Sequence, residues 1–149
     1  MSRTKRENTK LTRNNLGFLL AKASQRWNAA LYERFCAHGF PQVRPSFGAI
    51  LIPLFEQDGL RLGELAQRAG LSKQTMTTMV RLVEKAELVV TRADPKDRRA
   101  TRVYLSKAAR RFEPVAEKVL AELDDQAADM GGREVLQRVC LWLGRFANS

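Results

Sequence analysis

The chain has 149 residues, 44% of them hydrophobic, and a net charge of +10 from 26 Lys and Arg against 16 Asp and Glu. That composition fits one domain with a buried core, which excludes wholesale disorder, and the positive field indicates a polyanionic partner. No apolar run approaches the roughly 20 residues of a membrane span, and the basic stretch from Met1 to Arg13 leads into an amphipathic segment rather than a signal peptide. We therefore expect a cytoplasmic protein with no membrane partner.

The first two predicted helices precede residue 58. Steps of three and four between apolar residues predict a long amphipathic helix from about Asn15 to Ala37, which Gly39 and Pro41 end. Its stripe consists of Leu16, Leu19, Leu20, Ala23, Trp27, Ala30, Leu31 and Phe35. A second helix is predicted over residues 45–57, in which Pro53 should kink or shorten the run because proline lacks a backbone donor.

A helix-turn-helix follows. A short helix near residues 63–69 ends at Gly70, which can take the left-handed conformation, and Ser72 is a good N-cap for the next helix, at about 73–86. The apolar face of that second helix carries Met76, Met79, Val80 and Val83. Its opposite face is polar and consists of Lys73, Gln74, Thr75, Thr77, Thr78 and Arg81.

Two short β-strands, at residues 88–90 and 102–105, enclose a charged loop at 93–99. The remainder is helical, with one apolar stripe from Phe112 to Met130 and another from Val135 to Phe146. The predicted fold is mainly α with a small β-hairpin, in a single domain over residues 1–149. A winged helix-turn-helix core at 45–106 is flanked by long dimerisation helices at 14–38 and 107–147.

The positive charge is concentrated beside the helix-turn-helix. Eight basic residues and two acidic ones lie between Thr91 and Arg111, whereas residues 112–130 hold six acids and one lysine. A helix-turn-helix with a hairpin can read duplex DNA, because the second helix fits the major groove and an arginine on the hairpin can enter the minor groove. Gln74, Thr75 and Thr78 offer hydrogen bonds to bases, and Lys73 and Arg81 suit phosphate or guanine.

Leu60 to Ser106 resembles the winged-helix core of the MarR family. The most specific part is Asp94-Pro95-Lys96-Asp97-Arg98-Arg99 followed by Leu105-Ser106, which is similar to that family's wing signature. The resemblance implies an obligate dimer with intertwined terminal helices, Arg99 in a minor groove and Asp97 as the carboxylate that orients it. The expected DNA-binding residues are Ser72, Lys73, Gln74, Thr75, Thr77, Thr78, Arg81, Lys96, Asp97, Arg98 and Arg99. Glu87 stands where the family usually has a glycine.

Two sets of residues outside the wing have alternative interpretations. Trp27, Phe35, Trp142 and Phe146 are expected to form a dimer core, with a small-molecule cage as the alternative. Cys36 and Cys140 are expected to be reduced, half-buried thiols, while a disulfide or a redox role stays open. With His38 they cannot supply a zinc site at any familiar spacing, so neither metal nor cofactor is expected.

These features predict a sequence-specific, DNA-binding transcriptional regulator. We expect a repressor that acts as a homodimer on a pseudo-palindromic operator, with a small aromatic molecule as the candidate effector. The alternative is a sequence-tolerant nucleoid-associated or RNA-binding protein, which the positive charge would also serve. An enzyme is not expected, because there is a single histidine and no recognisable nucleophile–base pair, metal cluster or phosphate-binding glycine loop.

Overall fold

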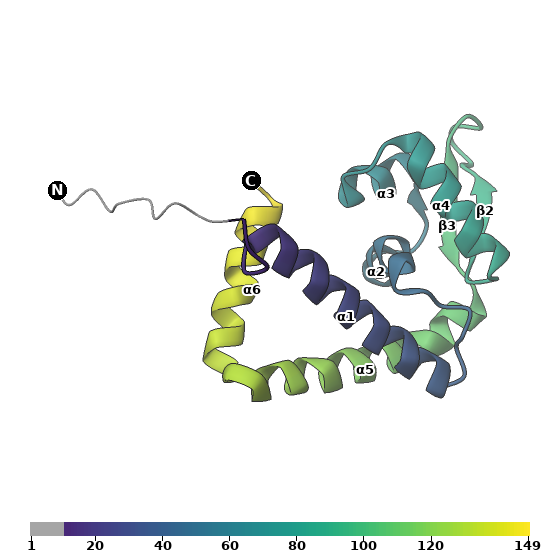
Figure 1. The fold of residues 1–149 in the computed structure, drawn as a ribbon. Helices are drawn as coiled ribbons and strands as arrows, with labels where there is room; N and C mark the ends of the chain where they lie inside the picture. Colours follow the sequence, from purple (N-terminus) through teal and green to yellow (C-terminus); the bar gives the residue numbers. More distant parts are fainter. Residues whose placement is uncertain (1–10) are drawn as a thin grey trace.

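A computed structural model describes residues 11–149, so most of the basic stretch from Met1 to Arg13 lies outside the described residues. Figure 1 shows a framework of α1, α5 and α6 beside a smaller unit that holds α2, α3, α4 and the sheet. In chain order the elements are α1 (Leu16–Ala37), a single 3-10 turn (Pro45–Phe47), α2 (Gly48–Glu56), β1 (Leu60–Arg61), α3 (Leu62–Ala69), α4 (Lys73–Lys85), β2 (Val89–Ala93), β3 (Thr101–Leu105), α5 (Lys107–Gly131) and α6 (Arg133–Ala147). The predicted fold class is confirmed.

The sheet has three antiparallel strands in the order β1-β3-β2. Val89 pairs with Leu105 and Thr91 with Val103, while Leu60 of β1 pairs with Val103 from the other side. The sequence predicted only the hairpin of β2 and β3. A strand of two residues has no alternating pattern from which to recognise it, so β1 was missed.

The core lies between α2, α3, α4, α5 and the sheet, and α1 packs against α5 beside it. Its buried side chains include Leu31, Ile50, Leu51, Leu54, Met76, Val80, Val83, Val103, Phe112, Val119 and Leu123. Phe35 of α1 packs edge-on against Phe112 of α5, with ring centroids 4.8 Å apart. Phe35 therefore belongs to the core of its own chain, which corrects its assignment to a dimer core.

The second helix, predicted over residues 45–57, is divided into two parts in the structure. A 3-10 turn precedes the α-helix, which starts at Gly48 and continues through Pro53 to Glu56. The backbone N–H of Gln57 donates to the carbonyl of Pro53 at 2.9 Å, so the last turn closes beyond the proline. α2 is thus short, and it lies between the framework and the helix-turn-helix (Figure 1).

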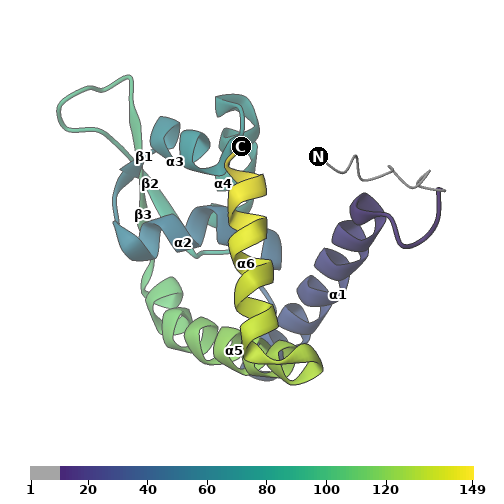
Figure 2. The same cartoon turned by 90° about the vertical axis from the view of Figure 1, so that its left-hand side faces the viewer.

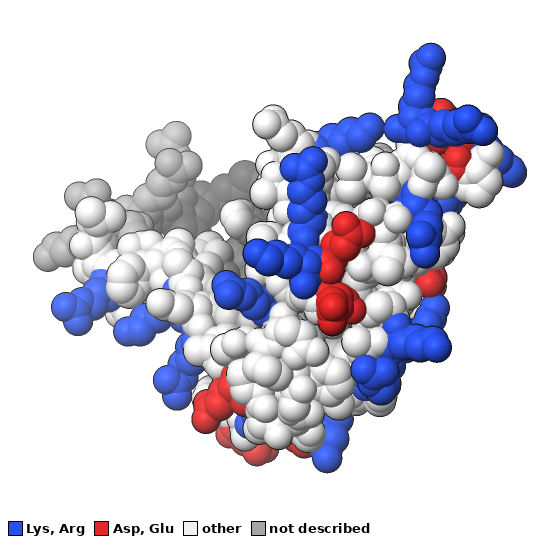
Figure 3. Space-filling model, turned by 90° about the vertical axis from the view of Figure 1, so that its right-hand side faces the viewer, with Lys and Arg blue, Asp and Glu red and all other residues white. Residues whose placement is uncertain are grey.

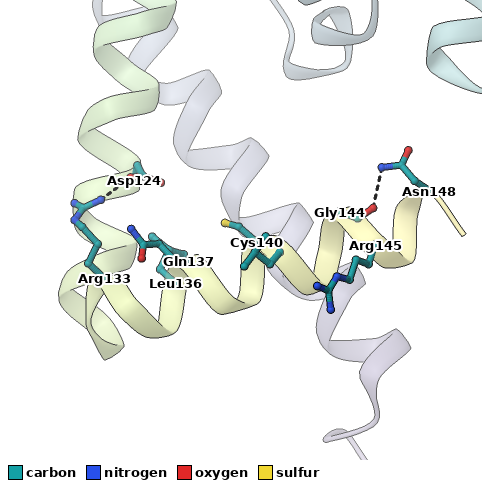
Figure 4. Close-up of a pocket in the computed structure, with 9 residues that line it drawn as sticks. Asp124, Arg133, Leu136, Gln137, Cys140, Gly144, Arg145 and Asn148 are labelled. Carbon is teal, nitrogen blue, oxygen red and sulfur yellow. Dashed lines mark hydrogen bonds and ion pairs between the residues drawn. The ribbon is translucent and has the colours of Figure 1, made fainter.

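The last helix, α6, departs from the end of α5 at a sharp bend (Figure 2). Gly132 forms the bend with a positive φ of 92°, and Arg133 pairs with Asp124 at 3.1 Å and Asp125 at 2.7 Å. None of the 15 residues of α6 is buried in this chain. One side of α6 borders an open hollow of about 830 Å³ that includes Cys140 and Arg145 (Figure 4).

Both cysteines are exposed free thiols, so the expectation that they are half-buried is wrong, and they form no disulfide with each other. Within residues 11–149, no helix combines the length and the apolar character that crossing a membrane requires.

Candidate nucleic-acid interface

The turn between α3 and α4 is built as the sequence predicted. Gly70 has φ 66° and ψ 29°, and the N–H groups of Gly70 and Leu71 donate to Gln67 and Ala66. Two such bonds close a helix end in the pattern that requires a left-handed residue. Ser72 then caps α4, because its hydroxyl oxygen accepts from the N–H of Thr75 at 3.1 Å. This turn fixes the direction of α4 relative to α3.

α4 presents its polar face to solvent. Met76, Val80 and Val83 are buried, whereas Lys73, Gln74, Thr75, Thr78 and Arg81 are exposed and Thr77 is half-buried. The polar face therefore points away from the core.

Two threonine hydroxyl groups on α4 donate hydrogen bonds to the helix backbone. Thr77 donates to the carbonyl of Lys73 at 2.8 Å, and Thr78 donates to that of Gln74 at 3.2 Å. In this arrangement both threonines offer an oxygen acceptor and a methyl group to a partner. A thymine methyl or a base amino group could meet them in a major groove.

The end of α4 is closed by a strained residue. Glu87 has a φ of 62°, and it is the one non-glycine residue with positive φ among those described. The N–H groups of Glu87 and Leu88 donate to the carbonyls of Glu84 and Val83, again the pattern that places a left-handed residue after a helix. A glycine, which the family resembled by the sequence usually has at this position, would adopt this φ without strain.

The wing is the loop between β2 and β3, and it projects from the body of the molecule (Figure 2). Asp97 accepts a hydrogen bond from the backbone N–H of Arg99 at 3.0 Å, and the carbonyl of Asp97 accepts from Ala100. Asp97 therefore shapes the backbone that carries Arg99. No ion pair joins these two side chains within the described chain, so the orientation of the Arg99 guanidinium by Asp97 stays a prediction.

The base of the wing is held by Asp94, a residue of the wing signature to which the sequence analysis gave no role. The side chain of Asp94 is 1% exposed and lies 2.7 Å from the guanidinium of Arg61 and 3.3 Å from that of Arg102. Its other oxygen accepts from the N–H of Lys96 at 2.9 Å. The pKa of Asp94 is lowered, first by that backbone hydrogen bond and then by Arg102 and Arg61, although burial opposes the shift.

A second carboxylate ties the sheet to the framework. Asp58 follows α2, and one of its oxygens accepts from the N–H groups of Gly59 at 3.0 Å and Leu105 at 2.8 Å. Its other oxygen lies 2.9 Å from the guanidinium of Arg110, in the first turn of α5. Arg102 completes the link by donating to the carbonyl of Gly59 at 2.8 Å. These contacts hold the start of β1 and the end of β3 against the start of α5.

Cationic side chains gather around the wing in the space-filling view (Figure 3). Arg61, Arg102 and Arg110 are engaged in the ion pairs described above. By contrast, the five cations of the predicted interface have no ion-pair partner within residues 11–149, and they are Lys73, Arg81, Lys96, Arg98 and Arg99. An exposed polar helix thus lies beside a cluster of free cations, an arrangement suited to a polyanion.

Residues 46–101 match the model of the MarR family. The structure of the transcriptional repressor CouR bound to a 23-mer DNA duplex aligns with a TM-score of 0.77 and 22% identity, over 93% of this chain and 99% of that chain. A probable transcriptional regulator from Pseudomonas aeruginosa aligns with a TM-score of 0.76 and 25% identity, over 89% and 97% of the two chains. CouR from Rhodococcus jostii RHA1 bound to p-coumaroyl-CoA aligns with a TM-score of 0.70 and 22% identity, over 90% and 92%. A search of curated protein sequences found no match.

Proposed function

We propose that this chain, whose residues 46–101 match the model of the MarR family, is a DNA-binding transcriptional regulator rather than an enzyme. It represses transcription as a homodimer on a pseudo-palindromic operator. The observation that carries the proposal is the exposed polar face of α4 beside a wing with free cations. In the winged-helix arrangement, α4 enters the major groove while Arg99 reaches the adjacent minor groove. Such a protein acts in the cytoplasm, where it meets its operator.

The proposed dimer is supported by apolar side chains without a partner in the chain. On α6, Trp142 and Phe146 stack at 5.1 Å between ring centroids, yet they are 44% and 56% exposed. The first half of α1 also exposes Leu16, Phe18 and Leu19. Solvent-exposed apolar residues on two helices that both join α5 indicate an interface, and a second copy of the chain supplies the same surfaces in return. Two copies would then present two α4 helices to two half-sites.

The proposed effector is a small aromatic molecule. A cavity of about 390 Å³ opens between α1, α2 and α5, and its lining is mostly apolar, with Phe35, Phe55 and Phe112 among its residues. Apolar cavities of this size suit small ligands. Since α2 connects this cavity to the helix-turn-helix, a ligand there could change the spacing of the two α4 helices. CouR from Rhodococcus jostii RHA1 was solved with p-coumaroyl-CoA, which is a precedent from another protein of this fold.

Sequence-tolerant binding to DNA or RNA is the competing proposal. The net charge of +10 would support it, but the charge alone does not account for the exposed amide and hydroxyl groups of α4. A non-specific binder needs cations and no ordered set of base-edge contacts.

Selection from fragmented genomic DNA with the purified protein would test the proposed function. We expect enriched fragments to share an inverted repeat and to bind at least 10³-fold more tightly than scrambled duplexes at the same salt concentration. Sedimentation of the complex should give two chains per duplex. Enrichment without a shared sequence would favour the non-specific alternative, and one chain bound tightly to a full palindrome would contradict the dimer.

A further inference from the structure

A polar hollow lies between the start of α4 and the base of the wing. It has a volume of about 340 Å³ and is called the notch here; its lining includes Arg61, Lys73 and Arg99. These three cations come from β1, from the first residue of α4 and from the end of the wing loop. Glu64 is the one carboxylate among the lining residues, so the lining carries a positive balance. An anion is therefore the kind of group that the notch fits.

The position of the notch between α4 and the wing indicates which anion binds there. If α4 occupies a major groove and Arg99 the adjacent minor groove, the sugar–phosphate strand that separates these grooves must cross the surface between α4 and the wing. The notch is the hollow on that surface. We propose that a DNA backbone phosphate sits in the notch and that Arg61 binds it, with Lys73 beside it. The proposal rests on the proposed function, and it adds Arg61 to the predicted contacts.

The guanidinium of Arg61 is held in a fixed position beside the notch. Its backbone is fixed by pairing with Arg102 across β1 and β3, and its side chain is held by Asp94 at 2.7 Å. The side chain nevertheless stays 40% exposed. A guanidinium has five N–H donors, so one nitrogen can face Asp94 while others face a phosphate oxygen. Because Asp94 already orders the side chain, less rotamer freedom is lost when the phosphate binds.

The competing explanation is that Arg61 only neutralises Asp94. Arg61→Gln alone cannot separate the two, because it leaves the buried carboxylate with Arg102 as its remaining ion-pair partner. The double variant Arg61→Gln/Asp94→Asn removes one positive and one negative charge together, so the net charge is unchanged. The single variant Asp94→Asn keeps the guanidinium of Arg61 and removes the carboxylate that holds it. Arg34→Gln serves as a remote control, since Arg34 pairs with Glu122 between α1 and α5 at 2.8 Å.

The measurement is the affinity for the selected operator between 50 and 200 mM salt. Each phosphate contact contributes about 0.9 to the slope of log affinity against log salt, so two half-sites should lower the slope of the double variant by about 1.8. Over that fourfold range its affinity should fall about tenfold less than that of the parent. Asp94→Asn and Arg34→Gln should keep the parent slope. A parent-like slope in the double variant would overturn the proposal.

Duplexes with single methylphosphonate linkages locate the contact. Neutralising one linkage per half-site, between the two contacted grooves, should weaken binding of the parent and leave the double variant unaffected. If every linkage affects both proteins equally, Arg61 does not bind phosphate. These results differ from failure of the proposed function, in which the parent itself would show a flat salt dependence or equal affinity for scrambled DNA.

Discussion

Arg110 of α5 and Asp58, in the turn after α2, form an ion pair of 2.9 Å that joins the DNA-binding unit to the framework. The same carboxylate also accepts the N–H groups of Gly59 and Leu105. One side chain therefore connects α2, the end of β3 and the first turn of α5. A movement of the start of α5 away from Asp58 would break these contacts.

We expect Asp58→Ala to destabilise the protein by about 1–3 kcal/mol, because two backbone N–H groups and Arg110 lose their acceptor. Urea unfolding of the parent and the variant would measure this difference. Glu134→Ala is a matched control, since Glu134 accepts from Arg138 on exposed α6 and makes no backbone bond across elements. Equal midpoints for Asp58→Ala and the parent would contradict the role of Asp58 as a junction.

Glu87→Gly should stabilise the chain by about 1 kcal/mol. Glu87 has a φ of 62°, where a side chain is strained and glycine is not. The hydrogen bond from the Ser106 hydroxyl to the carbonyl of Glu87, at 2.7 Å, uses only backbone atoms of residue 87 and is retained in the variant. Thermal unfolding gives the test, with Glu113→Gly inside α5 as the control that should lower the melting temperature. A lower melting temperature for Glu87→Gly would contradict the assignment of strain.

Asp94 should make the wing sensitive to acid. Its pKa in the folded protein is lowered, so its contribution to stability is present above the unfolded value of about 3.9 and is lost as pH falls through the lower folded pKa. Below about pH 4, the stability of the parent should therefore decline more steeply than that of Asp94→Asn. Denaturant unfolding between pH 2.5 and 6 would measure both curves. Parallel curves over this range would show that Asp94 gains nothing from its contacts in the folded state.

Features with a local pattern were predictable from the sequence, and those that depend on distant partners were not. Gly70 and Ser72 predict a turn because the left-handed conformation of glycine and the N-cap preference of serine are local properties. The structure confirms the left-handed Gly70 and the Ser72 cap. Asp94 was placed in the wing signature without a role, because its partner Arg61 is remote in sequence and no periodicity connects them. Phe35 was misassigned for a related reason, since a helical stripe does not reveal which chain covers it.

Affinities for operator and scrambled duplexes at one salt concentration test most directly whether α4 contacts bases in the major groove while the wing contacts the minor groove. Gln74→Ala and Thr78→Ala should each lose about 1–3 kcal/mol on the operator and little on scrambled DNA, because they remove contacts to base edges. Arg99→Ala should weaken operator binding in proportion to the A·T content of the flanking base pairs, and Asp97→Ala should cause a smaller loss of the same kind. If Arg99→Ala binds both duplexes as tightly as the parent, the wing has no role in DNA binding and the mechanism is wrong.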